Sequence, residues 1–149
     1  MKKNHCPDPD ATVEFEGASF SHETIFKVVN SFYHKVQEDE VLKVPFSSVK
    51  DWDRHIKKLT NFWWIKLGGK PYLGYRYNPI AKHYEAGFDE HFLKHWLSLF
   101  SDTLKEHLSD QQFDVWMSMA ERIGNHLTER DQVFRQKIIR ENMSNDAQE

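Results

Sequence analysis

The sequence predicts an all-α fold in a single domain. Four segments carry apolar residues at helical spacings of three and four, and no segment alternates convincingly with a period of two. Aromatic residues (Phe 11, Trp 5 and Tyr 5) make up 14% of the 149 residues, whereas Gly 6 and Pro 5 are few. A chain of this length usually forms one domain around one core. We therefore expect one helical domain with a bulky aromatic interior.

The first predicted helix begins near Ser21, a good N-cap residue, and runs to about residue 38. Pro45 and the acidic residues before it end the helix, and the irregular segment at 44–46 is expected to point Phe46 inward. The apolar positions of this helix share one face: Ile25, Val28, Val29, Phe32, Tyr33 and Val36.

The second predicted helix spans about residues 49–67 and stops at Gly68-Gly69. Its inner stripe includes a histidine among large apolar side chains, which places that histidine on the buried face. The stripe consists of Trp52, His55, Ile56, Leu59, Phe62 and Trp63.

A turn-rich aromatic stretch at 68–78 leads to Asn78-Pro79, an N-cap followed by proline at the first helical position. Gly87 limits the helix that follows to about two turns. A third long helix is expected from about Asp89 to His107, with Trp96 near its middle.

The fourth helix opens at Ser109 and Gln112, which have capping-box spacing, and extends to about Arg140. Ala120 and Gly124 leave a notch on it where another helix or a flat ligand could approach closely.

Outside this body, residues 1–20 are expected to be a flexible N-terminal extension. The central domain covers 21–128, and 129–149 form a C-terminal helical extension with a polar tail.

Composition excludes several classes of function. A net charge of -3 argues against nucleic-acid binding as the main role. Cys6 has no partner for an intrachain disulfide, and Asp8, Asp10 and Glu14 stand where a signal peptide would need an apolar core. No stretch approaches the roughly 20 apolar residues of a membrane span. We expect a cytoplasmic protein.

Histidine is the unusual component, with 9 residues. His5, His22 and His34 are expected to be solvated. His91 and His95 have a spacing that can hold zinc, but neither a glutamate after His91 nor a cysteine pair accompanies them, so a zinc site is not expected.

His55 and His83 differ from the others in their context. An imidazole on an apolar helix face costs free energy unless it meets a hydrogen-bond partner or a metal. Either histidine by itself is more often a satisfied core or surface residue than a ligand. Together with the phenol of Tyr33, the indole of Trp96 and the ring of Phe46, they nevertheless indicate a lined pocket.

Five short motifs stand in order along the chain: Phe-Tyr-His-Lys-Val at 32–36, Asp-Trp-Asp-Arg-His at 51–55, Asn-Phe-Trp at 61–63, Asn-Pro-Ile-Ala-Lys-His at 78–83, and His-Phe-Leu-Lys-His-Trp-Leu-Ser-Leu-Phe at 91–100. In order and spacing, over about residues 20–127, they resemble the group III truncated haemoglobins. The loop at 72–79 is longer than the family's usual stretch.

The resemblance implies a globin-like, truncated two-over-two helical sandwich that holds haem b (iron protoporphyrin IX). His83 would be the proximal ligand of the iron, bound through Nε2. Tyr33, His55 and Trp96 would lie on the distal side, where a hydrogen bond from the Tyr33 hydroxyl or the Trp96 indole stabilises bound dioxygen. The remaining expected haem contacts are Phe46, Leu59 and Trp63.

The implied function is binding of dioxygen, nitric oxide or another small diatomic ligand at a five-coordinate iron. Nitric oxide dioxygenation and peroxide chemistry are possible extensions, which require an electron donor that the sequence does not name. The alternative is an all-helical interaction module without cofactor, in which His83 is a surface residue and the inward aromatic residues only pack together. The oligomeric state is left open.

Overall fold

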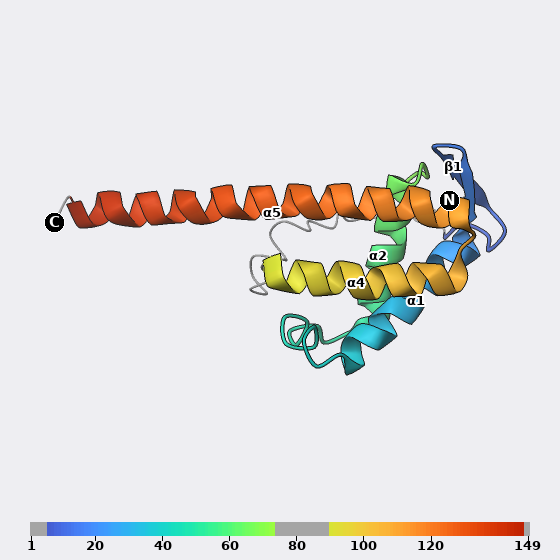
Figure 1. Ribbon diagram of the computed structural model, residues 1–149, viewed down its shortest axis with the longest axis horizontal. Helices are drawn as coiled ribbons and strands as arrows, with labels where there is room; N and C mark the ends of the chain where they lie inside the picture. The colour runs from blue at the N-terminus through green and yellow to red at the C-terminus, as the bar shows by residue number, and fades with distance from the viewer. Residues whose placement is uncertain (1–5, 74–89, 148–149) are drawn as a thin grey trace.

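The structure is a computed structural model that describes residues 6–73 and 90–147, and beyond residue 126 it describes few side chains. It consists of an N-terminal hairpin and four long helices (Figure 1). The expected short helix after Asn78-Pro79 lies outside the described residues. None of the described helices is long and apolar enough to cross a membrane.

Helix α1 comprises His22–Glu38 and confirms the first predicted helix. The Oγ atom of its N-cap, Ser21, accepts a hydrogen bond from the backbone N–H of Thr24 at 3.0 Å. The predicted apolar face is buried in full, and Asp39 follows as the C-cap. Helix α1 therefore forms where its local capping and periodicity predict it.

Helix α2 comprises Trp52–Lys66, so it begins later than the expected residue 49. The reason is its N-cap, because the Oδ1 atom of Asp51 accepts the backbone N–H of Arg54 at 3.1 Å. The helix ends at Lys66, just before Gly68-Gly69 as expected, and the φ of +109° at Gly68 suits glycine. A Cβ there would lie 2.8 Å from the carbonyl oxygen of Glu14, so the same glycine also permits close approach of the N-terminal segment.

Helices α4 (Glu90–His107) and α5 (Asp110–Ala147) confirm the remaining two long helices. The capping box is present, since Gln112 N–H donates to Ser109 Oγ at 3.2 Å and Ser109 N–H donates to Gln112 Oε1 at 3.0 Å. The predicted notch at Gly124 is occupied by Leu93 of α4, because a Cβ at Gly124 would lie 3.2 Å from the Leu93 side chain.

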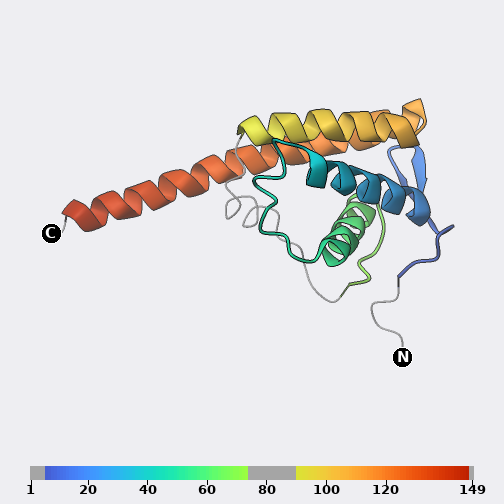
Figure 2. The same ribbon diagram turned by 90° about the horizontal axis from the view of Figure 1, so that it is seen from below.

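Helix α5 is longer than expected. It passes the predicted end at residue 140 and continues to Ala147, and no glycine or proline after Gly124 interrupts it. Its C-terminal half extends beyond the other described elements (Figures 1 and 2).

The expectation of a flexible N-terminal segment is wrong for residues 12–20. Strands β1 (Thr12–Phe15) and β2 (Ala18–Ser21) form an antiparallel hairpin. Its turn residues Glu16 and Gly17 both have positive φ, at 49° and 84°, as in the two-residue turns that match strand twist. The strands are too short to show a period of two clearly, so the sequence does not predict them. With this hairpin the fold is mostly helical and not purely so.

The hairpin is stabilised by contacts with the start of α5. Phe20 is fully buried, and its ring meets that of Trp116 edge to face at 5.7 Å. Gln111 and Gln112 donate side-chain hydrogen bonds to the carbonyl oxygens of Gly17 and Ser19, at 3.0 and 2.8 Å. The hairpin is therefore part of the core.

The helices pack as two layers, α1 with α2 and α4 with α5 (Figures 1 and 2). Helix α1 contacts both α2 and α4, so it joins the layers. The arrangement is the expected truncated two-over-two sandwich. Its fully buried large side chains come from the hairpin, from the three shorter helices, from the start of α5 and from the connections between them.

Replacing Phe20 with alanine should lower the free energy of unfolding by about 3–5 kcal/mol, because the substitution leaves a cavity against Trp116. Urea denaturation of the purified protein measures this. The control is Phe26→Ala, since Phe26 is 42% exposed and should change stability by no more than about 0.5 kcal/mol. Equal effects of the two substitutions would show that the hairpin is not part of the core.

Candidate functional site

Three of the residues expected to contact the haem, Tyr33, His55 and Phe46, lie together. The Tyr33 ring is edge to face with that of His55 at 5.2 Å and with that of Phe46 at 5.9 Å, and Phe46 lies 6.2 Å from His55. Trp52 completes the group, with its ring centroid 5.4 Å from that of His55 and 6.1 Å from that of Tyr33. We call these four residues the distal cluster.

Three separate elements supply the distal cluster. Tyr33 comes from the inner face of α1, and Trp52 and His55 come from the first turn of α2. Phe46 comes from the corner, residues 39–49, which connects the two helices. Its backbone N–H donates to the Leu42 carbonyl at 3.2 Å, and its own carbonyl accepts the N–H of Val49 at 3.1 Å. The corner therefore places Phe46 as predicted, pointing inward.

Polar atoms in the distal cluster are surrounded by apolar rings. Tyr33 is 3% exposed, and the Nε2 atom of His55 is buried. Aromatic rings gathered around a few hydrogen-bonding side chains are typical of the lining of a ligand pocket.

Trp63 and Trp96 belong to a second ring group, next to the distal cluster. Trp63 stacks on Phe100 at 5.5 Å, and Trp96 stacks on the same ring at 4.7 Å. Phe32 joins the two groups, because its ring meets Trp96 at 4.9 Å and Tyr33 at 4.8 Å.

Trp63 is 3% exposed, and its other neighbours are Phe62 and Trp116. Trp96 is half-buried, and Leu59 is buried on α2 between the helical positions of His55 and Trp63. The expected haem contacts therefore divide into a distal cluster and an adjoining aromatic core.

His83, the expected proximal ligand, lies outside the described residues. Within the parts that the structure describes, no three His, Cys, Asp or Glu side chains lie together as a candidate metal site.

The prediction that His22 is solvated is wrong. His22 is 6% exposed, its Nε2 lies 2.8 Å from the hydroxyl oxygen of Tyr72, and its ring packs against Trp64 at 5.1 Å. Burial lowers the pKa of His22, because desolvation disfavours the charged imidazolium. The first turn of α1, which contains His22, packs against α2. The position of His22 at the start of a predicted helix does not reveal this contact.

Among the other described histidines, His34 is exposed as predicted, and His91, His107 and His126 are exposed as well. His95 is half-buried, and its Nε2 lies 2.9 Å from both carboxylate oxygens of Asp39.

Sequence reasoning placed Trp52 on the inner stripe of its helix but did not count it among the site residues. Its spacing of three from His55 was the available indication, since residues three apart on a helix are neighbours.

Comparison with known proteins identifies the family. A family model described as bacterial-like globin matches residues 20–129, so the chain belongs to the bacterial-like globins. The group 3 truncated hemoglobin ctb of Campylobacter jejuni is 30% identical over 115 residues, which cover 72% of this chain and 88% of that protein. The crystal structure of a group III truncated hemoglobin from the same species superposes with a TM-score of 0.67 at 30% identity, covering 78% of this chain and 93% of that one. The chain is thus a homologue of the group III truncated haemoglobins.

A globin implies a haem cofactor that binds small ligands, and the described residues fit one. A porphyrin is flat and largely apolar, and the distal cluster presents aromatic rings of the same character. The cluster also contains hydrogen-bonding atoms of Tyr33 and His55 within that apolar lining, which a small polar ligand on the iron requires.

His22 should make stability depend on pH. In the unfolded chain its imidazole binds a proton with the ordinary histidine pKa of about 6.5, whereas in the folded chain burial lowers that pKa. The stabilisation is therefore complete above about pH 6.5 and is lost as pH falls through the folded pKa. The substitution His22→Gln should reduce this acid-side loss, measured by urea denaturation at about pH 5 and about pH 7.5. The exposed His34→Gln variant is the control, and an equal reduction there would contradict the assignment to His22.

Proposed function

We propose that this protein binds haem b and uses it to bind dioxygen, nitric oxide or another small diatomic ligand. The observation that carries the proposal is the packing of the Tyr33 and His55 rings within the distal cluster, in a chain of the globin family. The centroids of these two rings are 5.2 Å apart. His83 would hold the iron through Nε2, following the Asn-Pro-x-x-x-His motif. Phe46, Leu59, Trp63 and Trp96 are the proposed further contacts of the haem.

The haem would supply a ferrous iron with an open position for a diatomic ligand. The chain would supply hydrogen bonds and shelter. The Tyr33 hydroxyl donates a hydrogen bond to a ligand that gains negative charge, and such a charge-assisted bond contributes about 1.5–3 kcal/mol. The imidazole of His55 has two ring nitrogens that can form hydrogen bonds, so it orients either the ligand or the phenol.

The aromatic rings around these two residues exclude water. Phe46 and Trp52 flank the imidazole of His55, with centroids 6.2 and 5.4 Å away. An apolar surround strengthens the hydrogen bonds inside it and limits access of the water that promotes oxidation of the iron. The distal cluster therefore favours a long-lived bound ligand over rapid release.

Nitric oxide dioxygenation and peroxide chemistry are proposed as extensions of the same site, with an electron donor outside this chain. The paired phenol and imidazole favour them, because both can donate to developing negative charge. Mixing the dioxygen-loaded protein with nitric oxide in a stopped-flow instrument tests the first activity. Rapid conversion to the ferric spectrum with formation of nitrate supports it, and a slow reaction would restrict the protein to ligand binding.

The substitution His83→Ala should abolish or strongly weaken haem retention, because it removes the proposed iron ligand. Purified wild-type protein should show a Soret band, and the variant should lose it after desalting. The exposed His126→Ala variant serves as control and should retain haem. A wild-type chain that stays colourless with added hemin would favour a helical interaction module instead.

The substitution Tyr33→Phe should raise the dioxygen dissociation rate about ten- to a hundredfold, because it removes one charge-assisted hydrogen bond while keeping the ring. Stopped-flow displacement of dioxygen by carbon monoxide measures the rate. Retained haem content in the variant shows that the pocket is intact. An unchanged rate would assign the main donor to another residue.

A further inference from the structure

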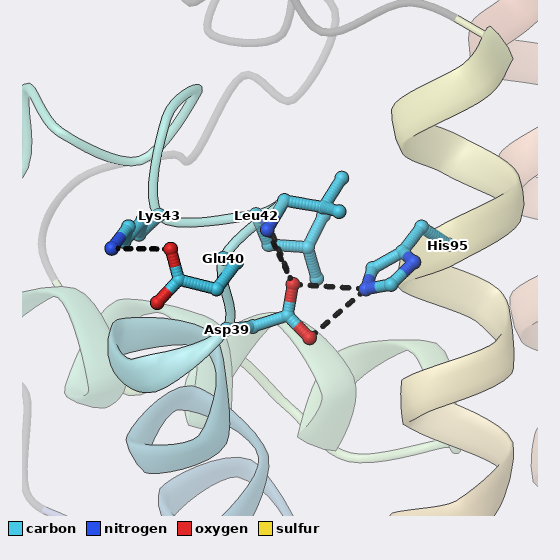
Figure 3. A network of polar contacts seen from close by, with 6 residues as sticks. Asp39, Glu40, Leu42, Lys43 and His95 are labelled. Carbon is cyan, nitrogen blue, oxygen red and sulfur yellow. Dashed lines mark hydrogen bonds and ion pairs between the residues drawn. The ribbon is translucent and has the colours of Figure 1, made fainter.

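Asp39 lies at the C-terminal end of α1, and its carboxylate accepts hydrogen bonds from three donor groups. Its Oδ1 accepts the backbone N–H groups of Val41 and Leu42 at 3.0 and 2.9 Å. Both of its oxygens lie 2.9 Å from the Nε2 of His95 on α4, which donates to them (Figure 3). One side chain thus joins the end of α1, the start of the corner and α4.

These bonds continue toward the distal cluster. Leu42, held by Asp39 through its N–H, is fully buried, and its carbonyl accepts the N–H of Phe46 at 3.2 Å. The Phe46 ring then packs against Tyr33 and His55. Asp39 is therefore connected to a ring of the distal cluster through a single intervening residue.

His95, the partner of Asp39, also lies close to rings that contact the distal cluster. His95 directly precedes Trp96, whose ring contacts Phe32 beside Tyr33. The nearby charged side chains pair with one another: Lys43 lies 2.8 Å from Glu40, and Lys94 lies 4.0 Å from Glu90. These two pairs are exposed and contribute little.

The ionised state of Asp39 is favoured. Burial raises its pKa, but the hydrogen bond from His95 and those from Leu42 and Val41 outweigh this effect, so its pKa lies below the usual range. The carboxylate thus stays a strong acceptor near neutral pH.

We propose that Asp39 and His95 are positioning residues of the ligand site. Their contact holds the corner against α4 and so keeps the Phe46 ring packed against the rings of Tyr33 and His55. The effect on ligand exchange rests on the proposed function. The effect on the corner itself is a property of the chain and does not depend on haem.

The packing of α1 on α4 does not depend on this contact alone. Lys35 of α1 also reaches α4, with its Nζ 3.1 Å from Thr103 Oγ1 and 2.7 Å from Glu106 Oε1. Variants of the partly exposed His95 should therefore fold, with the change confined to the corner.

Hydrogen exchange tests the positioning role in the purified chain. The substitution His95→Ala should speed exchange of the Leu42 and Phe46 amides about fivefold, and exchange in the first turns of α5 should not change. The substitution His95→Gln should restore protection, because its amide N–H₂ can donate to Asp39. The control is His91→Ala, an exposed histidine one turn earlier on α4.

Either no change in His95→Ala, or a change that His95→Gln does not rescue, would overturn the proposal. Uniformly faster exchange throughout the chain would also overturn it, since that result indicates a general loss of stability.

A second set of variants tests the coupling. Asp39→Ala should speed exchange at the corner more than His95→Ala does, because it also removes the bonds to Val41 and Leu42. Adding His95→Ala to Asp39→Ala should then have no further effect. Additive effects would show that the two residues act independently.

The dioxygen dissociation rate of haem-loaded protein gives the consequence for function. His95→Ala should raise it about two- to fivefold, with rescue by His95→Gln, because a looser Phe46 shelters the ligand less. Faster exchange at the corner with unchanged ligand rates would overturn the link to the site. Failure of the wild-type chain to retain haem would contradict the proposed function, and hydrogen exchange would still decide whether Asp39 and His95 position the corner.

Discussion

The structure depends on the burial of two consecutive aromatic residues on α1. Phe32 and Tyr33 are 0% and 3% exposed, and successive side chains on a helix diverge by about 100°. Phe32 therefore meets Trp96 and Phe100 of α4, whereas Tyr33 meets His55 of α2 and the corner. Because α1 presents one ring to each neighbour, it joins the two layers of the sandwich. The same geometry makes the distal cluster continuous with the aromatic core.

This continuity explains how a site with polar atoms persists inside a small domain. The ring contacts of the core contribute favourable packing around Tyr33, which helps to offset the cost of burying a side chain that carries a hydroxyl. The hairpin completes the opposite end of this core, because Phe20 covers Trp116, which in turn contacts Trp63 and Phe100. The hairpin thus belongs to the folded body and packs on the part of the aromatic core around Trp116.

Positioning of the distal cluster is divided between local and distant contacts. The inner faces of α1 and α2 follow from helical periodicity alone. Phe46 stands on an irregular corner, which lacks a repeating hydrogen-bond pattern and depends on individual bonds such as those of Asp39.

The sequence by itself determined the four long helices, the N-terminal caps of two of them and the family. These features are local: the Ser21 cap and the Ser109 capping box act over three residues, and helical faces repeat every turn. Tertiary structure alone decided the hairpin, the burial of His22 and the contact of Asp39 with His95, which are 56 residues apart in the chain. Four-residue strands carry too little periodicity to be recognised, and the surroundings of a histidine are set by distant segments whose approach depends on the packing of the whole chain.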